Sequence, residues 1–293
     1  MAPAPSIPKA AFWMALSIAS FLLMSVAGRA TTSALSVFQV LEMRSVIGWF
    51  ILLPLVISQG GFAAMASPRL PLHIARNVIH YVGQGAWLYA LTLIPLGVLI
   101  SIEFTTPIWT ALLAVLFLGE RLNKFRIASI VLGLIGVVII VRPSTGSVDT
   151  GHLIVLGAAA CFGASVVMVK ALTRTDSVVR IIFWMLVVQS VLGLVPALLE
   201  WRNPSLSLWP WIFTIAFTGM SSHFCMARAL TYADATLIST MDFLRVPLSA
   251  LLGWLVYHEQ IDAFTAGGAA LILMGNLLNL QKRPAKPAEV AAS

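Results

Sequence analysis

Long apolar runs occupy most of this chain and constrain its fold more than any other feature. A run of about 20 apolar residues can cross the hydrocarbon core of a bilayer as a helix. The 293-residue chain is 59% hydrophobic and 10% charged, whereas about 25% of the residues in soluble globular proteins are charged. The bilayer is therefore the expected solvent. Helices, which satisfy their own backbone hydrogen bonds, are the expected elements.

The apolar runs predict ten transmembrane helices separated by short joints. Turn-forming pairs such as Ile94-Pro95 and Asn203-Pro204 mark these joints, and no joint is long enough to hold a soluble domain. The predicted spans are Phe12–Gly28, Val37–Ser58, Leu72–Leu91, Leu96–Leu118, Phe125–Val141, His152–Ala171, Val179–Leu199, Trp209–Leu230, Ala235–Tyr257 and Phe264–Leu280.

Basic residues are divided unevenly between alternate joints, which predicts the orientation of the chain. With a cytoplasmic N-terminus, the outer joints hold only Arg29, Arg142 and Arg202. This asymmetry follows the positive-inside rule and places both termini in the cytoplasm. The net charge of +7 forms no aromatic-interleaved basic patch, so no nucleic-acid partner is expected. The cytoplasmic joints hold Lys9, Arg69, Arg76, Arg121, Lys124, Arg126, Lys170, Arg174, Arg180, Arg228, Lys282, Arg283 and Lys286.

A diverged copy of residues 89–140 returns about 139 positions later. Glu103-Phe104 recurs as Asp242-Phe243, and Glu120 recurs as Glu259. The ten spans divide into two repeats of five, an odd number, so the second repeat enters the membrane from the opposite side. The predicted fold is therefore an all-α integral membrane protein of two inverted five-helix repeats with a cavity between them near mid-bilayer. The expected divisions are a cytoplasmic N-terminus (1–10), a first repeat (11–145), a second repeat (150–281) and a disordered cytoplasmic tail (282–293).

The third predicted span carries a polar and aromatic face. Asn77, His80, Gln84 and Trp87 follow steps of three and four residues and so lie on one side of a helix, with Tyr81 at its border. Hydrogen-bonding groups beside aromatic surface suit an amphipathic small molecule. Hydrogen bonding between helices explains the same pattern equally well.

Charged groups within spans are costly, so they usually face a cavity or a partner. Glu103 and Asp242 occupy equivalent repeat positions and are candidates to bind an ammonium group or a proton. Arg245 follows Asp242 by three residues, which makes an intrahelical pair feasible. Glu103 has no basic neighbour in its own span and is therefore the stronger functional candidate. Glu42 and Arg44 fall on different faces of the second span, and Arg44 is free to reach across to a carboxylate.

Three further positions are candidates for the transport machinery. His223 aligns with Gln84 in the repeat, although a lone histidine in a helix is more often structural. Pro107 and Pro247 each remove a backbone hydrogen bond within a span, as a gating hinge or as a simple packing kink. Glu120 and Glu259, at span ends, are expected to anchor joints.

Small residues in the closing spans are expected to let helices approach closely within the molecule. They are Gly133, Gly136, Gly267, Gly268 and Gly275. A monomer is expected, with a dimer as the alternative. Cys161 and Cys225 lie inside apolar runs and are treated as small hydrophobic residues. No metal-ligand pattern or cofactor motif is present in the sequence, so no cofactor is expected.

The block Leu118-Gly119-Glu120-Arg121-Leu122, followed by Gly133 and Gly136, resembles the repeat ending of the drug/metabolite transporter superfamily. Its second version is Tyr257-His258-Glu259-Gln260-Ile261, in which His258 replaces the glycine. Ten spans in two EamA-type repeats match that superfamily across nearly the whole chain. Within it, the chain is most similar to the YddG-type aromatic amino-acid exporters. This resemblance implies a multi-pass carrier of the bacterial inner membrane that exports aromatic and other neutral amino acids.

The primary functional hypothesis is therefore export by alternating access, with small-molecule contacts from His80, Tyr81, Gln84 and Trp87. The alternative in the same class is a drug, sugar-phosphate or other metabolite carrier. An intramembrane enzyme is a distant alternative because the sequence has no Gly-x-Ser-x-Gly or His-Glu-x-x-His motif. A channel is disfavoured because no selectivity-filter segment is repeated.

Overall fold

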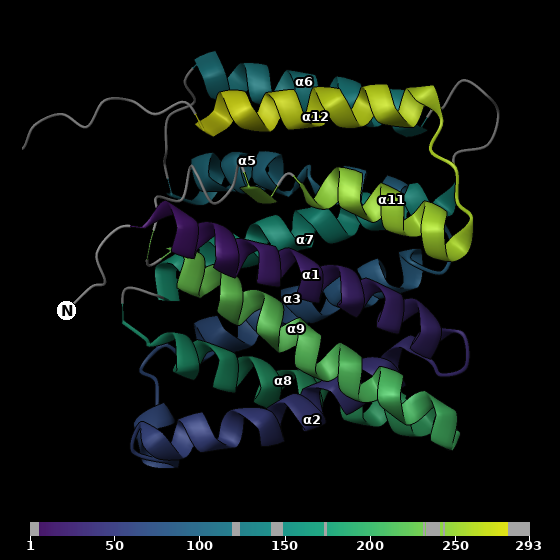
Figure 1. Cartoon of the computed structure of the whole chain (residues 1–293). Coiled ribbons are helices and arrows are strands. Elements are labelled where there is room, and N and C mark those ends of the chain that lie inside the picture. Colours follow the sequence, from purple (N-terminus) through teal and green to yellow (C-terminus); the bar gives the residue numbers. More distant parts are fainter. Residues whose placement is uncertain are drawn as a thin grey trace, which may run out of the picture.

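The computed structural model describes residues 6–118, 124–141, 149–172, 175–230, 232, 241–242 and 244–280. In these ranges the chain is entirely helical, apart from its connecting segments. Some predictions concern segments outside the described residues, namely Glu120, Arg121, Arg142, the first part of the ninth span and the tail. Figure 1 shows the helices packed into one bundle.

The helices occupy the positions of the ten predicted spans, with the fourth span divided in two. Ser36 and Ser177 begin α2 and α8 in the same way, since each hydroxyl accepts a hydrogen bond from a backbone N–H three residues later. Short 3₁₀ turns, η1 (Phe62–Met65) and η3 (Leu206–Leu208), precede α3 and α9. The helices are α1 (Ile7–Thr32), α2 (Val37–Ser58), α3 (Leu70–Ala90), α4 (Leu96–Glu103), α5 (Thr106–Leu118), α6 (Lys124–Val141), α7 (Thr150–Leu172), α8 (Val178–Leu199), α9 (Trp209–Leu230), α11 (Arg245–Tyr257) and α12 (Ala263–Leu280).

The outer surface of the bundle is apolar, as expected of a surface that faces lipid. Phe50, Val191 and Leu199 are 63%, 70% and 81% exposed, and a protein in water would not leave so many large side chains outside. By length and hydropathy, four of the described helices could each cross a bilayer: Ile7–Thr32, Val37–Ser58, Thr150–Val169 and Val178–Leu199. The remaining helices are shorter or carry inward-facing polar groups. Arg76, assigned to a joint by the sequence analysis, is one of these groups, because it lies buried within α3.

The helix contacts are consistent with a two-fold relation between the halves. Helix α1 packs on α9 as α7 packs on α3, and α2 packs on α9 as α8 packs on α3. Three further pairs, α2 with α8, α4 with α11 and α6 with α12, join equivalent helices to each other. Figure 1 shows α6 and α12 at one edge of the bundle and α2 and α8 at the opposite edge.

The two halves also run in opposite directions. The last turn of α1 meets the segment between α3 and α4, where the Arg29 Nε donates to the Leu91 carbonyl at 2.9 Å. The first turn of α7 meets that same segment, since a Cβ at Gly151 would lie 2.5 Å from Ile94. Helix α1 therefore ends where α7 begins, as an inverted repeat predicts. The start of α1 and the end of α12 share the other end of the bundle (Figure 1), while their cytoplasmic placement stays a prediction.

The span predicted from 96 to 118 is divided into two helices, because the chain breaks between α4 and α5, beside the proline that the sequence analysis named as a hinge or kink. Pro107 stands in the first turn of α5 and cannot donate to the Glu103 carbonyl, which instead accepts from the Thr106 hydroxyl at 2.7 Å. The Phe104 carbonyl accepts from the buried Asn276 Nδ2 of α12 at 2.7 Å. Pro247 likewise lies in the first turn of α11. Both prolines thus mark helix starts, and their gating role stays a prediction.

Glycines bring α6 and α12 into backbone contact within the molecule, as the small residues predicted. A Cβ added at Gly136 would lie 2.6 Å from the Gly268 carbonyl oxygen, and a Cβ at Gly268 would lie 2.6 Å from that of Gly136. Larger side chains at either position would force the two helices apart.

Candidate functional site

The polar face predicted on α3 is turned into the bundle. His80, Tyr81 and Trp87 are buried, and Gln84 is half-buried. The Gln84 Oε1 accepts from the Arg44 Nη2 of α2 at 2.7 Å. This face therefore lies among helices rather than in lipid.

His80 also joins this interior network. Its Nδ1 lies 3.0 Å from the Gln189 Nε2 of α8, and its ring lies 5.6 Å from that of Phe162 on α7. His223, on α9, is exposed and forms no hydrogen bond with the other described candidates.

Glu103 and Asp242 lie close together because Arg245 contacts both. The Arg245 Nη2 donates to the Asp242 Oδ2 at 2.5 Å, so the predicted pair forms, although Asp242 precedes α11, which begins at Arg245. Its Nη1 lies 3.5 Å from the Glu103 Oε1, while the Glu103 Oε2 accepts from the Trp87 Nε1 at 2.6 Å. Glu103 thus has no basic neighbour in its own span, but it is paired with a cation from the other half of the chain.

Aromatic rings enclose this charge cluster. The Arg245 Cζ lies 4.2 Å from the ring centroid of Phe21 and 5.1 Å from that of Phe104, distances typical of cation–π contacts. The Phe21 and Trp87 rings meet edge to face at 5.9 Å. The cluster thus combines planar apolar surface, two carboxylates and one guanidinium, and it joins helices of both halves.

Glu42 is a further interior carboxylate, which the sequence analysis left out of the site. It is 6% exposed, and among the described residues its Oε2 has no hydrogen-bond partner. The Tyr81 hydroxyl is also buried and unpartnered in the described chain. Both groups converge on Gly193 of α8, where a Cβ would lie 2.6 Å from the Glu42 Oε2 and 2.8 Å from the Tyr81 hydroxyl. The absence of a side chain at Gly193 is what leaves room for them.

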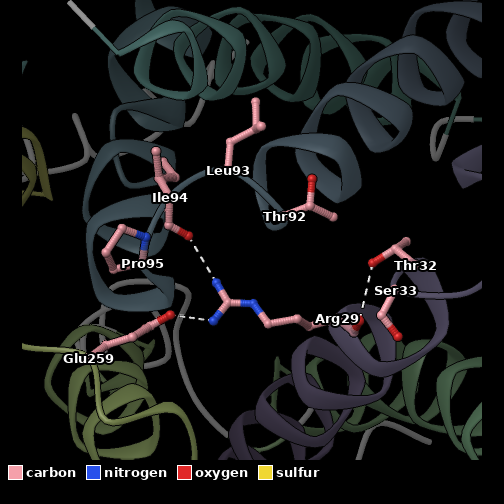
Figure 2. Close-up of a pocket in the computed structure, with 8 residues that line it drawn as sticks. All are labelled: Arg29, Thr32, Ser33, Thr92, Leu93, Ile94, Pro95 and Glu259. Carbon is pink, nitrogen blue, oxygen red and sulfur yellow. Dashed lines mark hydrogen bonds and ion pairs between the residues drawn. The ribbon is translucent and has the colours of Figure 1, made fainter.

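A pocket of about 540 Å³ lies at the end of the bundle, not at its middle. Figure 2 shows the Arg29 guanidinium crossing it toward the Ile94 carbonyl and Glu259. The Arg29 Nη2 donates to that carbonyl at 2.9 Å, and Nη1 forms an ion pair with the Glu259 Oε1. The pocket is lined by Arg29, Thr32, Ser33, Thr92, Leu93, Ile94, Pro95 and Glu259.

Glu259 anchors the joint after α11, as its position at a span end predicted. Its Oε2 accepts from the Leu96 N–H at 2.8 Å, at the start of α4. His258, which replaces the repeat's glycine, adopts a left-handed φ of 54°. That conformation normally favours glycine, so the turn persists despite the substitution. Together, Arg29 and Glu259 tie the end of α1 to the start of α4 and to the joint after α11; we refer to them as the Arg29 latch.

At the opposite end, Asp176 ties the α7–α8 joint to the segment before α3. It accepts from the Arg180 Nη1 at 2.8 Å and from the Ser67 hydroxyl at 3.2 Å. Burial acts to raise the pKa of Asp176, but hydrogen bonds from Arg180, Thr175 and Ser67 outweigh it and hold the pKa below 3.8. This joint is thus fixed by a buried carboxylate that stays ionised.

Metal-binding geometry is not found within the described residues, where no group of three or more His, Cys, Asp or Glu side chains could hold an ion. Cys161 and Cys225 are free thiols. The described residues can therefore bind a solute by hydrogen bonding, ion pairing and aromatic contact.

Comparison with known proteins supplies the family. The profile of the EamA-like transporter family matches residues 8–142 and 149–281. The S-adenosylmethionine uptake transporter of Rickettsia prowazekii (strain Madrid E) is 26% identical over 265 residues, covering 90% of each chain. The riboflavin transporter of Brucella anthropi is 30% identical over 239 residues, covering 79% of this chain and 84% of that protein. The pseudopaline exporter CntI of Pseudomonas aeruginosa is 26% identical over 261 residues, covering 87% and 90%.

A solved crystal structure shares the fold. It superposes with a TM-score of 0.59 at 18% identity, covering 94% of this chain and 97% of that one. The narrower resemblance to aromatic amino-acid exporters finds no specific support in these relatives. Two matches of the family profile, which together span nearly the whole chain, show that this protein belongs to the EamA-like transporter family and is a multi-pass membrane transporter of metabolites rather than an enzyme.

Proposed function

We propose that the protein carries small metabolites that combine a planar ring with polar or charged groups, by alternating access between its two halves. The observation that supports this proposal is the aromatic-walled charge cluster of Phe21, Trp87, Glu103, Phe104 and Arg245. It joins α1, α3, α4 and α11 and so depends on how the halves meet.

The chemistry of the cluster fits such a substrate. A ring entering beside Phe21 and Trp87 gains stacking of about 0.5–1.5 kcal/mol beyond the area it buries. Glu103 can accept hydrogen bonds from an amine or ring N–H, and Arg245 can donate to a carboxylate or carbonyl oxygen. In the structure, Arg245 pairs with both Asp242 and Glu103.

Related carriers give two substrates to test first. S-adenosylmethionine and riboflavin, named for two of the relatives, both join a heteroaromatic ring to polar groups. Aromatic amino acids are the second candidate, transported outward, because they offer a ring and an ammonium group for Glu103. The relatives include both uptake transporters and an exporter, so direction is part of the test.

The experiment is a counterflow panel in proteoliposomes with labelled riboflavin, S-adenosylmethionine and tryptophan, competed by phenylalanine, nucleosides and cationic drugs. We expect saturable counterflow of at least one ring-bearing compound, with competition among its analogues. Flux that rises linearly with concentration and resists competition would indicate a channel and contradict the proposal.

A pair of tryptophan variants tests where the substrate binds. Trp87→Ala removes a ring and the 2.6 Å hydrogen bond to Glu103, so the half-saturation concentration should rise about tenfold or more, a loss of about 1.4 kcal/mol or more. The control, Trp254→Ala, removes a ring that is 56% exposed on the outer surface and should leave it unchanged. Equal effects would remove the cluster from the binding site.

A further inference from the structure

Glu42 stands apart from the other interior carboxylates because no cation among the described residues forms an ion pair with it. Glu103 and Asp242 share Arg245, and Glu259 is paired with Arg29. Glu42 lies in the interior of α2, 6% exposed, and forms no ion pair or side-chain hydrogen bond with any other described residue.

The charged and titratable groups around Glu42 are committed elsewhere or neutral. On α2, Arg44 donates to Gln84; on α3, Arg76 donates to the Asn77 Oδ1 at 2.7 Å, and His80 is bonded to Gln189 of α8. On α9, the titratable side chain nearest this region is His223, which forms no bond to Glu42. Among the described residues, the Tyr81 hydroxyl is the other polar group that lies nearest to Gly193 of α8.

An ionised carboxylate in this position would be unfavourable. Moving an isolated charge out of water costs several kcal/mol after relaxation, and such a group binds a proton instead. A protonated carboxyl has an O–H to donate, and the Tyr81 hydroxyl can accept it or donate in return. Protonation thus removes a buried charge and gives Glu42 an O–H in the same region as the Tyr81 hydroxyl.

We propose that Glu42 is the proton-binding site that couples transport to a proton gradient, beside the Tyr81 hydroxyl that is buried with it at Gly193. The inference rests on the proposed carrier function and adds its coupling ion. In the conformation that admits water to Glu42 from one side, the carboxylate takes one proton from solvent. In the opposite conformation it returns that proton to solvent, so each cycle restores the side chain and moves one H⁺.

The first test separates coupling from transport. Glu42→Gln keeps the size of the side chain and mimics a permanently protonated acid. With the substrate that the counterflow panel identifies, we expect this variant to retain substrate exchange. Its accumulation of substrate driven by a pH gradient should fall at least tenfold. Pyranine trapped in the same vesicles should report proton movement in the wild type and not in the variant.

Glu200→Gln is the matched control, since it removes a carboxylate that is exposed after α8 and should accumulate substrate like the wild type. Tyr81→Phe should shift the pH at which accumulation is half-maximal while retaining coupling. Gradient-driven accumulation by Glu42→Gln at the wild-type level would overturn the proposal.

A second test needs no substrate. In nanodiscs at neutral pH, infrared spectra of the wild type should contain the carbonyl stretch of a protonated carboxylic acid. This band should disappear in Glu42→Gln and persist in Glu200→Gln. A band unchanged by Glu42→Gln would show that Glu42 is not the protonated group. A panel without counterflow would reject the carrier function alone, and the spectra would still decide the state of Glu42.

Discussion

Arg245 joins side chains that are far apart in the sequence. Its guanidinium contacts Asp242 three residues before it and Glu103 in the other half, and Trp87 holds the second oxygen of Glu103. One cation thus compensates two carboxylates at equivalent repeat positions. A substrate that competes for either carboxylate would free part of the guanidinium for its own acceptor groups.

Glu103→Gln should therefore weaken transport. The amide keeps an acceptor for the Trp87 Nε1 but removes the charge that faces Arg245. We expect transport to fall about tenfold or more, equivalent to about 1.4 kcal/mol, with normal expression and an altered pH dependence in the counterflow assay. Wild-type transport would assign Glu103 to packing alone.

The acid sensitivity of folding should depend on Asp176. Its pKa is lower in the folded chain than in the unfolded one, so its stabilising contribution is present above about pH 4 and is lost as pH falls through the folded pKa. Asp176→Asn should destabilise the protein by about 1.5–3 kcal/mol at neutral pH. Thermal unfolding in detergent should show the difference in stability between the wild type and Asp176→Asn becoming smaller from pH 7 to pH 3. Glu200→Gln should unfold like the wild type. A difference for Asp176→Asn that does not change with pH would contradict the linkage.

The limits of sequence reasoning at this scale follow from distance along the chain. The α3 face was predictable because residues three and four apart share a helix face. The contact of Glu103 with Arg245 was not, because it depends on how two halves pack. The unpaired state of Glu42 was not predictable either, because it depends on the missing side chain at Gly193 of another helix.

At the scale of elements, the apolar runs placed the helices well because hydropathy and length act locally. The division of the fourth span was missed, although Pro107 was recognised. Its cause is partly tertiary, since Asn276 of α12 satisfies the exposed Phe104 carbonyl. Symmetric details, such as the serine N-caps of α2 and α8 and the internal prolines Pro54 and Pro196, became visible only in the structure.

Adjacent glycines of α12 provide a matched test of the contact between α6 and α12. Gly268→Ala would place a Cβ 2.6 Å from the Gly136 carbonyl oxygen, and such overpacking should destabilise the protein by about 1–3 kcal/mol. Gly267→Ala meets nothing within 4 Å and should be neutral or stabilising, since alanine favours helix by about 1 kcal/mol over glycine. Unfolding midpoints in detergent measure both, and equal midpoints would contradict the contact.

At the scale of the molecule, the two repeats are interleaved. Helix α1 packs mainly on α9, α3 on α7, α2 on α8 and α6 on α12, and every one of these contacts joins one repeat to the other. Rocking of two intact repeats would break all of them. Alternating access therefore requires moving bodies that each combine helices from both repeats.

Breaking the Arg29 latch should open the end of the bundle that it closes. Arg29 holds α1 to the carbonyls of Leu91 and Ile94 and to Glu259 beyond α11. In a background without Cys161 and Cys225, Ile94→Cys, at a site 3% exposed, should react about tenfold faster with an impermeant maleimide when Arg29→Ala is added. A tenfold faster reaction reports a tenfold larger population of the state in which this end is open, which corresponds to about 1.4 kcal/mol.

Arg202→Ala removes an exposed arginine from the same end of the bundle and should leave the labelling rate unchanged. Acceleration by both variants would point to a general charge effect on the reagent. Acceleration by neither would show that other contacts keep this end closed.

The glycine contact between α6 and α12 is a direct backbone connection to which both repeats contribute. Backbone meets backbone at Gly136 and Gly268, and the side chains of Ile140 and Ile272 pack beside them, so the two helices have little room to slide past each other. During the transport cycle α6 and α12 would then stay in contact, and the other helices would move relative to this pair.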